Sequence, residues 1–212
     1  MGSKATRQQI VDAADLLFYH QGYAPTSFSD IAAAVQISRG NFYYHFKTKD
    51  QILDAVIAAR LAKTEQMLAG WESHTEDPAA RIRSFIDILI RNRSDIERFG
   101  CPVGTLSAEL AKLDHASQAE AVALFTLFRS WLARQFTLLG RSADADALAL
   151  HLLARSQGVA TLANAFAEDS FISHEVGLMH AWLSEIINTP PPETAPGGPR
   201  LKWRPAASGG RQ

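Results

Sequence analysis

Residues 26 to 49 read TSFSDIAAAVQISRGNFYYHFKTK and contain two short helix patterns separated by a tight connection. Ser27 and Asp30 form an S-x-x-D signal for a helix start, because the serine oxygen accepts a hydrogen bond from an unpaired amide and the aspartate suits the positive helix end. The first helix is therefore expected to begin near Phe28. Its run of alanines at 32 to 34 is small enough to let another helix approach closely.

The second helix pattern follows after a very short turn. Ile37 is expected to fill the turn, and Ser38 is placed to cap a helix that runs from Arg39 to about His45. Phe42 and Phe46 lie four residues apart and face inward, which leaves a mostly polar outer surface. The stretch as a whole therefore predicts a helix-turn-helix.

The outer surface of the second helix carries groups that suit contacts with DNA. Arg39 matches the hydrogen-bonding edge of guanine and Asn41 that of adenine, while hydroxyl and imidazole groups donate to phosphate oxygens. No acidic residue stands between Asp30 and Asp50, so the local charge is positive. The residues expected to contact DNA are Thr26, Ser27, Ser38, Arg39, Gly40, Asn41, Tyr43, Tyr44, His45, Lys47 and Lys49. The alternative is a buried pair of aromatic helices with no role at DNA.

This stretch resembles the DNA-binding domain of the TetR family of bacterial repressors. The resemblance rests on Gly22-Tyr23, Thr26-Ser27, Ile31-Ala32, Ile37-Ser38-Arg39-Gly40, Phe42-Tyr43-Tyr44-His45-Phe46 and Lys49. Gln36 departs from the family pattern, which has glycine in the turn, and a positive φ at this residue would cost roughly 1 kcal/mol. The resemblance implies a homodimer. It also implies that the distance between the two DNA-binding domains changes when the helix after the helix-turn-helix tilts.

Composition limits the remaining classes of function. The chain has 212 residues, a net charge of -1 and a single cysteine. The charge argues against a general nucleic-acid coat protein, and one cysteine excludes an intrachain disulfide framework, which favours a reducing cytoplasm. No stretch of the sequence has the length of apolar residues that a membrane helix or a signal peptide needs. A soluble protein without a membrane partner is expected.

Apolar residues recur at helical spacing through most of the chain, with little strand signal, so the expected fold is all-α. We expect a helix-turn-helix domain over residues 1–48, a helical effector-binding and dimerisation domain over 49–188, and a disordered tail over 189–212, which is rich in proline and glycine. The expected helices are, approximately, 4–21, 28–35, 39–45, 49–71, one that starts at Pro78 and continues past Ile90, a short one at 107–110, and 116–139, 144–166 and 173–188. The last two are expected to form a four-helix interface between two subunits.

The segment FGCPVGTLSAELAKL, residues 99 to 113, stands apart because Gly100, Pro102 and Gly104 are expected to break the helix. Cys101 then lies before a helix start with Arg98 nearby, an arrangement that favours a reactive thiolate. The segment also resembles one in a branch of the family, some of whose members respond to electrophiles through this cysteine, although Thr105 replaces the usual asparagine. The alternative is a small buried residue that packs the bend.

A cavity for a small effector is expected between the central helices, and the family resemblance points to the same place. The residues expected to contact the effector are Phe85, Leu89, Phe99, Cys101, Phe125, Phe128, Trp131, His151 and Arg155, with Trp71 and Gln157 as further candidates. No cofactor or metal site is expected, because the spacing of the histidines does not match a metal motif. The leading hypothesis is a homodimeric repressor that binds a double-stranded DNA operator. A thiol enzyme that uses Cys101 and an architectural DNA binder without an effector are the alternatives.

Overall fold

The computed structural model describes residues 3–168 and 170–190, and these residues form eleven α-helices with no strand among them. The all-α fold is therefore confirmed. The helices are α1 (Ser3–Gln21), α2 (Phe28–Val35), α3 (Arg39–His45), α4 (Lys49–His74), α5 (Pro78–Ile86), α6 (Ile88–Arg91), α7 (Arg93–Phe99), α8 (Pro102–Lys112), α9 (Gln118–Leu138), α10 (Ala145–Phe166) and α11 (Phe171–Asn188). The predicted tail lies, beyond residue 190, outside the described residues.

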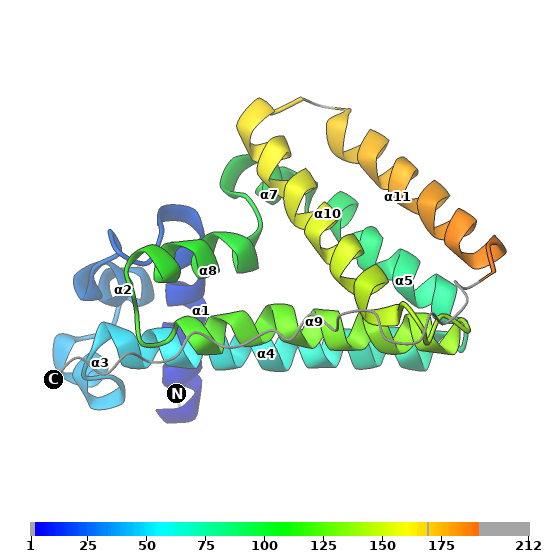
Figure 1. Ribbon diagram of the computed structural model, residues 1–212. Helices are drawn as coiled ribbons and strands as arrows, with labels where there is room; N and C mark the ends of the chain where they lie inside the picture. The colour runs from blue at the N-terminus through cyan, green and yellow to red at the C-terminus, as the bar shows by residue number, and fades with distance from the viewer. Residues whose placement is uncertain (1–2, 169, 191–212) are drawn as a thin grey trace, which may run out of the picture.

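The first three helices and the start of α4 surround one hydrophobic core, at the left of Figure 1. The two predicted caps are confirmed: the side chain of Ser27 accepts from the Asp30 amide in a full capping box, and that of Ser38 accepts from the Asn41 amide. Gln36 ends α2 with φ of 52° and ψ of 39°, in the left-handed region. The turn therefore keeps the backbone shape that a glycine adopts without strain.

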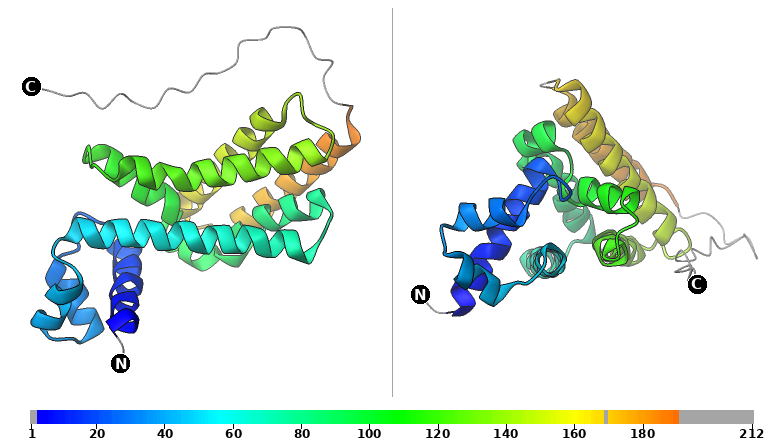
Figure 2. Two further views of the ribbon diagram at one scale, coloured as in Figure 1. Left: turned by 90° about the horizontal axis from the view of Figure 1, so that it is seen from below. Right: turned by 90° about the vertical axis from the view of Figure 1, so that its left-hand side faces the viewer.

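Helix α4 connects the two parts of the molecule, because its 26 residues run from the first core into a second one. Ile52, Leu53 and Val56 belong to the first core, whereas Leu68 belongs to the second, to which α5, α6, α7, α9, α10 and α11 also contribute. Helix α9 packs along α4 (Figure 2). Since one unbroken helix serves both cores, a tilt of α4 in one part moves the other.

Two predictions about helix breaks are wrong. The helix expected to run on from Pro78 is interrupted at Asp87 and at Asn92, which gives α5, α6 and α7. Gly104 does not break a helix either, since α8 begins at Pro102 and passes through Gly104. Proline suits the first turn of a helix because its missing amide has no partner there. A Cβ built on Gly104 would lie 2.5 Å from the Oε1 atom of Gln157, so Gly104 lets the Gln157 side chain of α10 lie against α8.

Helix α8 lies between the second core and the helix-turn-helix. Its Leu106 and Leu110 are buried in the first core, although their helix follows α7 in the chain. Figure 1 shows α8 passing across the upper side of α9 toward α1 and α2. The sequence places α8 with the expected effector domain, but its packing joins it to the helix-turn-helix.

Candidate DNA interface and ligand cavity

The outer face of α3 carries exposed aromatic and polar side chains. Tyr43 is 49% exposed and Tyr44 is 70% exposed, whereas Phe42 and Phe46 are 1% and 2% exposed. The inward direction of the two phenylalanines is therefore confirmed. Asn41 is also exposed, so α3 presents an amide and two phenol groups to the surroundings.

Several of the predicted DNA contacts already have partners within the chain. Thr26 is fully buried and its hydroxyl donates to the carbonyl oxygen of Gly22 at 2.6 Å. Lys49 Nζ donates to three carbonyl oxygens, those of Tyr23, Ala24 and Thr26, at 2.9 to 3.2 Å. These two side chains fix the turn between α1 and α2. Their geometry suits support of the interface more than direct contact with DNA.

The remaining predicted contacts lie around α3. Ser27 and Ser38 are exposed at the starts of α2 and α3, with their hydroxyls bound to those helix ends. Gly40 has open space beside it, His45 is half-buried, and Lys47 Nζ donates to the carbonyl oxygen of Tyr43. Arg39 begins α3, but its side chain lies outside the described part of the structure. Together these residues form one surface, whose contact with DNA stays a prediction.

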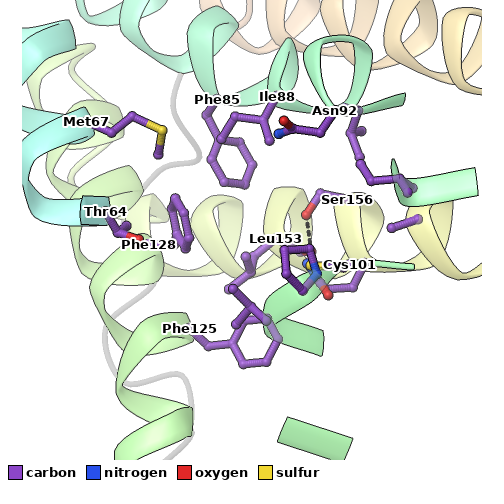
Figure 3. A pocket seen from close by; sticks show the side chains of 16 residues that line it. Thr64, Met67, Phe85, Ile88, Asn92, Cys101, Phe125, Phe128, Leu153 and Ser156 are labelled. Carbon is purple, nitrogen blue, oxygen red and sulfur yellow. Dashed lines mark hydrogen bonds between the residues drawn. The ribbon is translucent and has the colours of Figure 1, made fainter. Parts of the chain in front are cut away.

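A cavity of about 210 Å³ lies among α4 to α10, each of which contributes at least one lining residue. Figure 3 shows Phe85 and Phe128 next to each other, with Asn92 and Ser156 on another side of the space. The two rings lie edge to face, with centroids 5.5 Å apart. Of the sequence-predicted effector residues, the structure brings five to this cavity, namely Phe85, Leu89, Cys101, Phe125 and Phe128. Gln157, a further candidate, also lines it.

The other predicted effector residues lie elsewhere. Phe99 stacks on His20 with centroids 4.1 Å apart, and His151 packs on Trp182 at 5.0 Å. Arg155 pairs with Glu175 of α11 at 3.2 Å. Trp131 is buried beside Trp71, and its indole donates to Glu72 at 2.6 Å. These aromatic and charged groups hold helices together rather than line the cavity.

Several residues that line the cavity were not expected from the sequence. Thr64 and Met67 of α4, Asn92 before α7, and Leu153 and Ser156 of α10 all reach the cavity. Thr64 and Met67 are three apart, as are Leu153 and Ser156, so each pair shares a helix face. That spacing was a usable signal, but nothing in the sequence separates these faces from other apolar faces.

Polar contacts tie the cavity wall to the helix-turn-helix. Arg60 of α4 is 8% exposed; it donates from Nε to Asp15 of α1 and from Nη1 to the carbonyl oxygen of Pro102, both at 2.6 Å. Tyr19 of α1 donates to the carbonyl oxygen of Gly100 at 2.8 Å. Pro102 itself lines the cavity. The residues at the start of α8, from Gly100 to Pro102, are thus bound to α1 and α4 on one side and border the cavity on the other.

The far end of α8 touches the turn between α1 and α2. The carboxylate of Glu109 accepts from the amides of Tyr23 and Ala24, each at 2.8 Å. The hydroxyl of Tyr23 donates to Asp50 at 2.5 Å and lies 3.2 Å from His115 Nε2. Burial and the hydrogen bond to Asp50 raise the pKa of the Tyr23 hydroxyl well above its usual value. This tyrosine therefore stays protonated and joins α4 to the end of α8.

Cys101 is half-buried and caps the start of α8 without a side-chain hydrogen bond to it. The backbone amide and the hydroxyl of Thr105 both donate to the carbonyl oxygen of Cys101 at 2.9 Å. Histidines of the described residues do not line the cavity beside this thiol; His180, for example, is 2.8 Å from Asp87. A thiol enzyme would need such a base next to its nucleophile.

The described residues also bear on metals and membranes. No three side chains of the metal-binding types gather closely enough in residues 3–168 and 170–190 to hold an ion. Within the same ranges, no helix combines the length and the apolar character needed to span a bilayer.

The fold and the α2–α3 unit define the class as helix-turn-helix transcriptional regulators, and comparison with known proteins agrees. Residues 10–56 match the model of the tetR family of bacterial regulatory proteins. An HTH-type transcriptional regulator in the lacX 3′ region of Lactococcus lactis subsp. lactis is 30% identical over 136 residues, which cover 63% of this chain and 69% of that protein. The transcriptional repressor DhaR of Mycobacterium sp. strain GP1 is 25% identical over 133 residues, which cover 62% of this chain and 64% of DhaR.

Solved structures extend the similarity over most of the chain. A TetR transcriptional regulator from Chloroflexus aurantiacus J-10-FL superposes with a TM-score of 0.75 at 25% identity, covering 86% of this chain and 96% of that one. A TetR-family regulator from Agrobacterium tumefaciens has a TM-score of 0.75 at 21% identity and covers 85% and 98% of the two chains. The chain belongs to the tetR family of bacterial regulatory proteins.

Proposed function

We propose that this chain is a homodimeric repressor that binds a pseudo-palindromic DNA operator through α3 and leaves it when a small apolar or electrophilic molecule occupies the cavity. One observation carries the proposal: a helix-turn-helix and an apolar cavity share α4 and α8 in the same chain. A relative named as a transcriptional repressor, DhaR, supports repression as the regulatory effect.

The surface of α3 supports contact with the major groove. Asn41 offers the paired donor and acceptor that suit adenine, and Tyr43 and Tyr44 offer hydroxyl groups for phosphates. Arg39, Gly40, His45 and Lys47 complete the proposed contact set with Ser27 and Ser38, while Thr26 and Lys49 position the turn beneath it. Because the whole chain has a net charge of -1, affinity must come from this local surface and from pairing of two copies.

Exposed apolar side chains on α10 and α11 support a dimer. Leu150, Leu162 and Phe166 of α10 are 41 to 61% exposed, and Leu178 and Ile187 of α11 are 43% and 39% exposed. Apolar surface of this kind on a monomer favours association. Two copies joined here would carry two α3 helices, and successive major grooves on one side of DNA lie about 34 to 36 Å apart.

The contacts of Pro102 suggest how an occupied cavity weakens DNA binding. A molecule in the cavity presses on Pro102, whose carbonyl oxygen is held by Arg60, and Arg60 is held by Asp15 of α1. A shift of this segment therefore moves α1 and α4 together. The effector acts by preferring the arrangement that does not bind DNA.

Selection of bound sites from a random duplex library tests the proposal directly. Purified, reduced protein is expected to enrich one palindromic site, and Asn41→Ala is expected to lower affinity for it about tenfold. Leu138→Ala, which shortens an exposed side chain at the far end of α9, is the matched control and should leave affinity unchanged. Absence of an enriched site, with protein that is folded and dimeric, would contradict the proposal.

Mild alkylation separates the two kinds of effector. If Cys101 is the sensor, alkylation releases the wild-type protein from its site and leaves Cys101→Ser bound. If both proteins stay bound, the effector is a molecule that binds without a covalent bond. The architectural alternative predicts binding that does not depend on sequence.

A further inference from the structure

We propose that the cavity takes a neutral molecule of about one ring that carries a hydrogen-bond donor, and that Ser156 accepts this hydrogen bond. The inference rests on the proposed role of the cavity as the effector site and specifies the chemistry of its ligand. Charge, volume and the state of the Ser156 hydroxyl each contribute a separate restriction.

Charge is the first restriction. The described residues that line the cavity include no aspartate, glutamate, lysine, arginine or histidine. Arg155, next to Ser156 in the chain, is paired with Glu175 of α11, and Arg60, which binds the carbonyl oxygen of Pro102, is paired with Asp15; none of these four side chains lines the cavity. An ionised ligand would lose its hydration without gaining a counter-charge, which is strongly unfavourable. The cavity therefore selects against carboxylates and ammonium groups.

Volume is the second restriction. An apolar cavity of about 150 Å³ holds one benzene molecule, so the 210 Å³ found here correspond to about eight non-hydrogen atoms. The edge-to-face pair of Phe85 and Phe128 borders this space, and Phe125 lies on a neighbouring side (Figure 3). Aromatic rings favour a further ring in offset or edge-to-face contact. A single substituted ring meets both conditions.

The hydroxyl of Ser156 is the third restriction. Ser156 is 6% exposed, lines the cavity, and donates its proton to the carbonyl oxygen of Leu153 at 2.8 Å (Figure 3). Among the described residues no hydrogen bond from another group reaches this oxygen. With its proton committed, the oxygen offers only lone pairs to a ligand. The side chains of Thr64, Asn92 and Gln157 also line the cavity and can either donate or accept, whereas Ser156 can only accept. Ser156 therefore favours a ligand with an O–H or N–H group.

Three probes of about the same size separate these restrictions. Para-cresol and anisole are isomers, and only para-cresol has an O–H donor; benzylammonium is of similar size and carries a charge. Isothermal titration calorimetry with the full-length protein is expected to show para-cresol binding about five to ten times more tightly than anisole. Benzylammonium is expected to bind at least roughly 100 times more weakly than para-cresol.

Ser156→Ala tests the assigned acceptor with little change of shape. The variant is expected to bind para-cresol and anisole with equal affinity, while its anisole affinity stays as in the wild type. Ser184→Ala is the matched control, because Ser184 makes the same kind of bond to the carbonyl oxygen of His180 but lies on α11, away from the cavity. This control should keep the preference for para-cresol.

The binding measurements test the inference about the ligand independently of the proposed repressor function. Benzylammonium that binds as well as para-cresol, equal binding of the two isomers by wild type, or no binding of either isomer up to its solubility limit overturns the inference. The operator selection described above is scored separately. If a palindrome is selected but one of these three results is obtained, the proposed repressor function holds and the inference about the ligand fails. If para-cresol binds as expected but no site is selected, the inference about the ligand holds and the proposed function fails.

Discussion

Arg60 donates a hydrogen bond to the carbonyl oxygen of Pro102 at 2.6 Å, and this bond connects a buried side chain of α4 to a residue that lines the cavity. The same guanidinium binds Asp15 of α1 at 2.6 Å. Both contacts leave Arg60 only 8% exposed. Arg60 thus joins α4, α1 and the start of α8, which are distant in sequence. Its replacement is therefore expected to affect both the stability of the protein and its response to an effector.

Arg60→Met keeps an unbranched, largely apolar stem but removes the charge and the hydrogen-bond donors of the guanidinium. We expect the free energy of unfolding to fall by about 3 kcal/mol, because Asp15 and the Pro102 carbonyl lose their partner in a mostly buried place. Urea denaturation measures the change. Lys63→Ala is the control, since its pair with Asp12 is 3.5 Å long and exposed, and should change stability by less than about 0.5 kcal/mol. Equal effects of the two substitutions would refute the structural role of Arg60.

Gln36→Gly relieves backbone strain in the turn of the helix-turn-helix. Gln36 has φ of 52°, where a side chain is unfavourable, so we expect the substitution to stabilise the protein by about 0.5 to 1 kcal/mol. Thermal unfolding and operator affinity are both measured. Ala33→Gly, inside α2, should instead destabilise by about 1 kcal/mol. A loss of stability in Gln36→Gly would show that the side chain contributes more than its backbone shape costs.

Tyr19 gives the protein a defined response to alkaline pH. Burial, aided by the negative charge of Asp95, raises the pKa of its hydroxyl from 10.0 to about 12. The unfolded chain loses this proton first, so the tyrosine's contribution is complete below pH 10 and is lost as the pH rises toward 12. We expect Tyr19→Phe to reduce the fall in stability across this interval.

The same substitution has an effect at neutral pH. Tyr19→Phe removes the bond to the carbonyl oxygen of Gly100 and is expected to lower stability by about 1 kcal/mol at pH 7. Denaturant unfolding at neutral and alkaline pH measures both effects. Tyr44→Phe, on the exposed face of α3, is the control. An unchanged alkaline slope in Tyr19→Phe would contradict the assignment.

Lys47→Ala tests the electrostatic part of DNA binding. Each protomer loses one proposed phosphate contact, so the slope of log affinity against log salt should fall by about 0.9 per protomer, or about 2 for a dimer. Fluorescence anisotropy on the selected operator measures the slope. Lys63→Ala removes an equal charge from the exposed side of α4 and should leave the slope unchanged. Equal slopes for Lys47→Ala and wild type would remove Lys47 from the interface.

Local signals determined the helix-turn-helix. Ser27, Asp30 and Ser38 act on amides within three residues, so their caps are readable from the sequence and appear as expected. The four-residue spacing of Phe42 and Phe46 likewise decides which side of α3 is buried, because helix geometry fixes it. Gln36 adopts the left-handed conformation at the place where the family pattern has glycine. In these places, sequence and structure agree because the interactions are local.

Tertiary packing decided the cavity and its connections. Periodicity places Phe85, Phe128 and Trp131 on apolar helix faces. Only the packing of α4, α9 and α10 decides that Trp131 binds Glu72, while Phe85 and Phe128 line the cavity. The sequence predicts that Gly104 breaks a helix, whereas the structure places Gly104 inside α8, beside Gln157 of α10. The sequence by itself determined α1 to α4 and the proposed DNA-reading face, but not the breaks between α5, α6 and α7 or the start of α8. Contacts between residues far apart in the chain determined the cavity and its link to α1, because they depend on how whole helices pack.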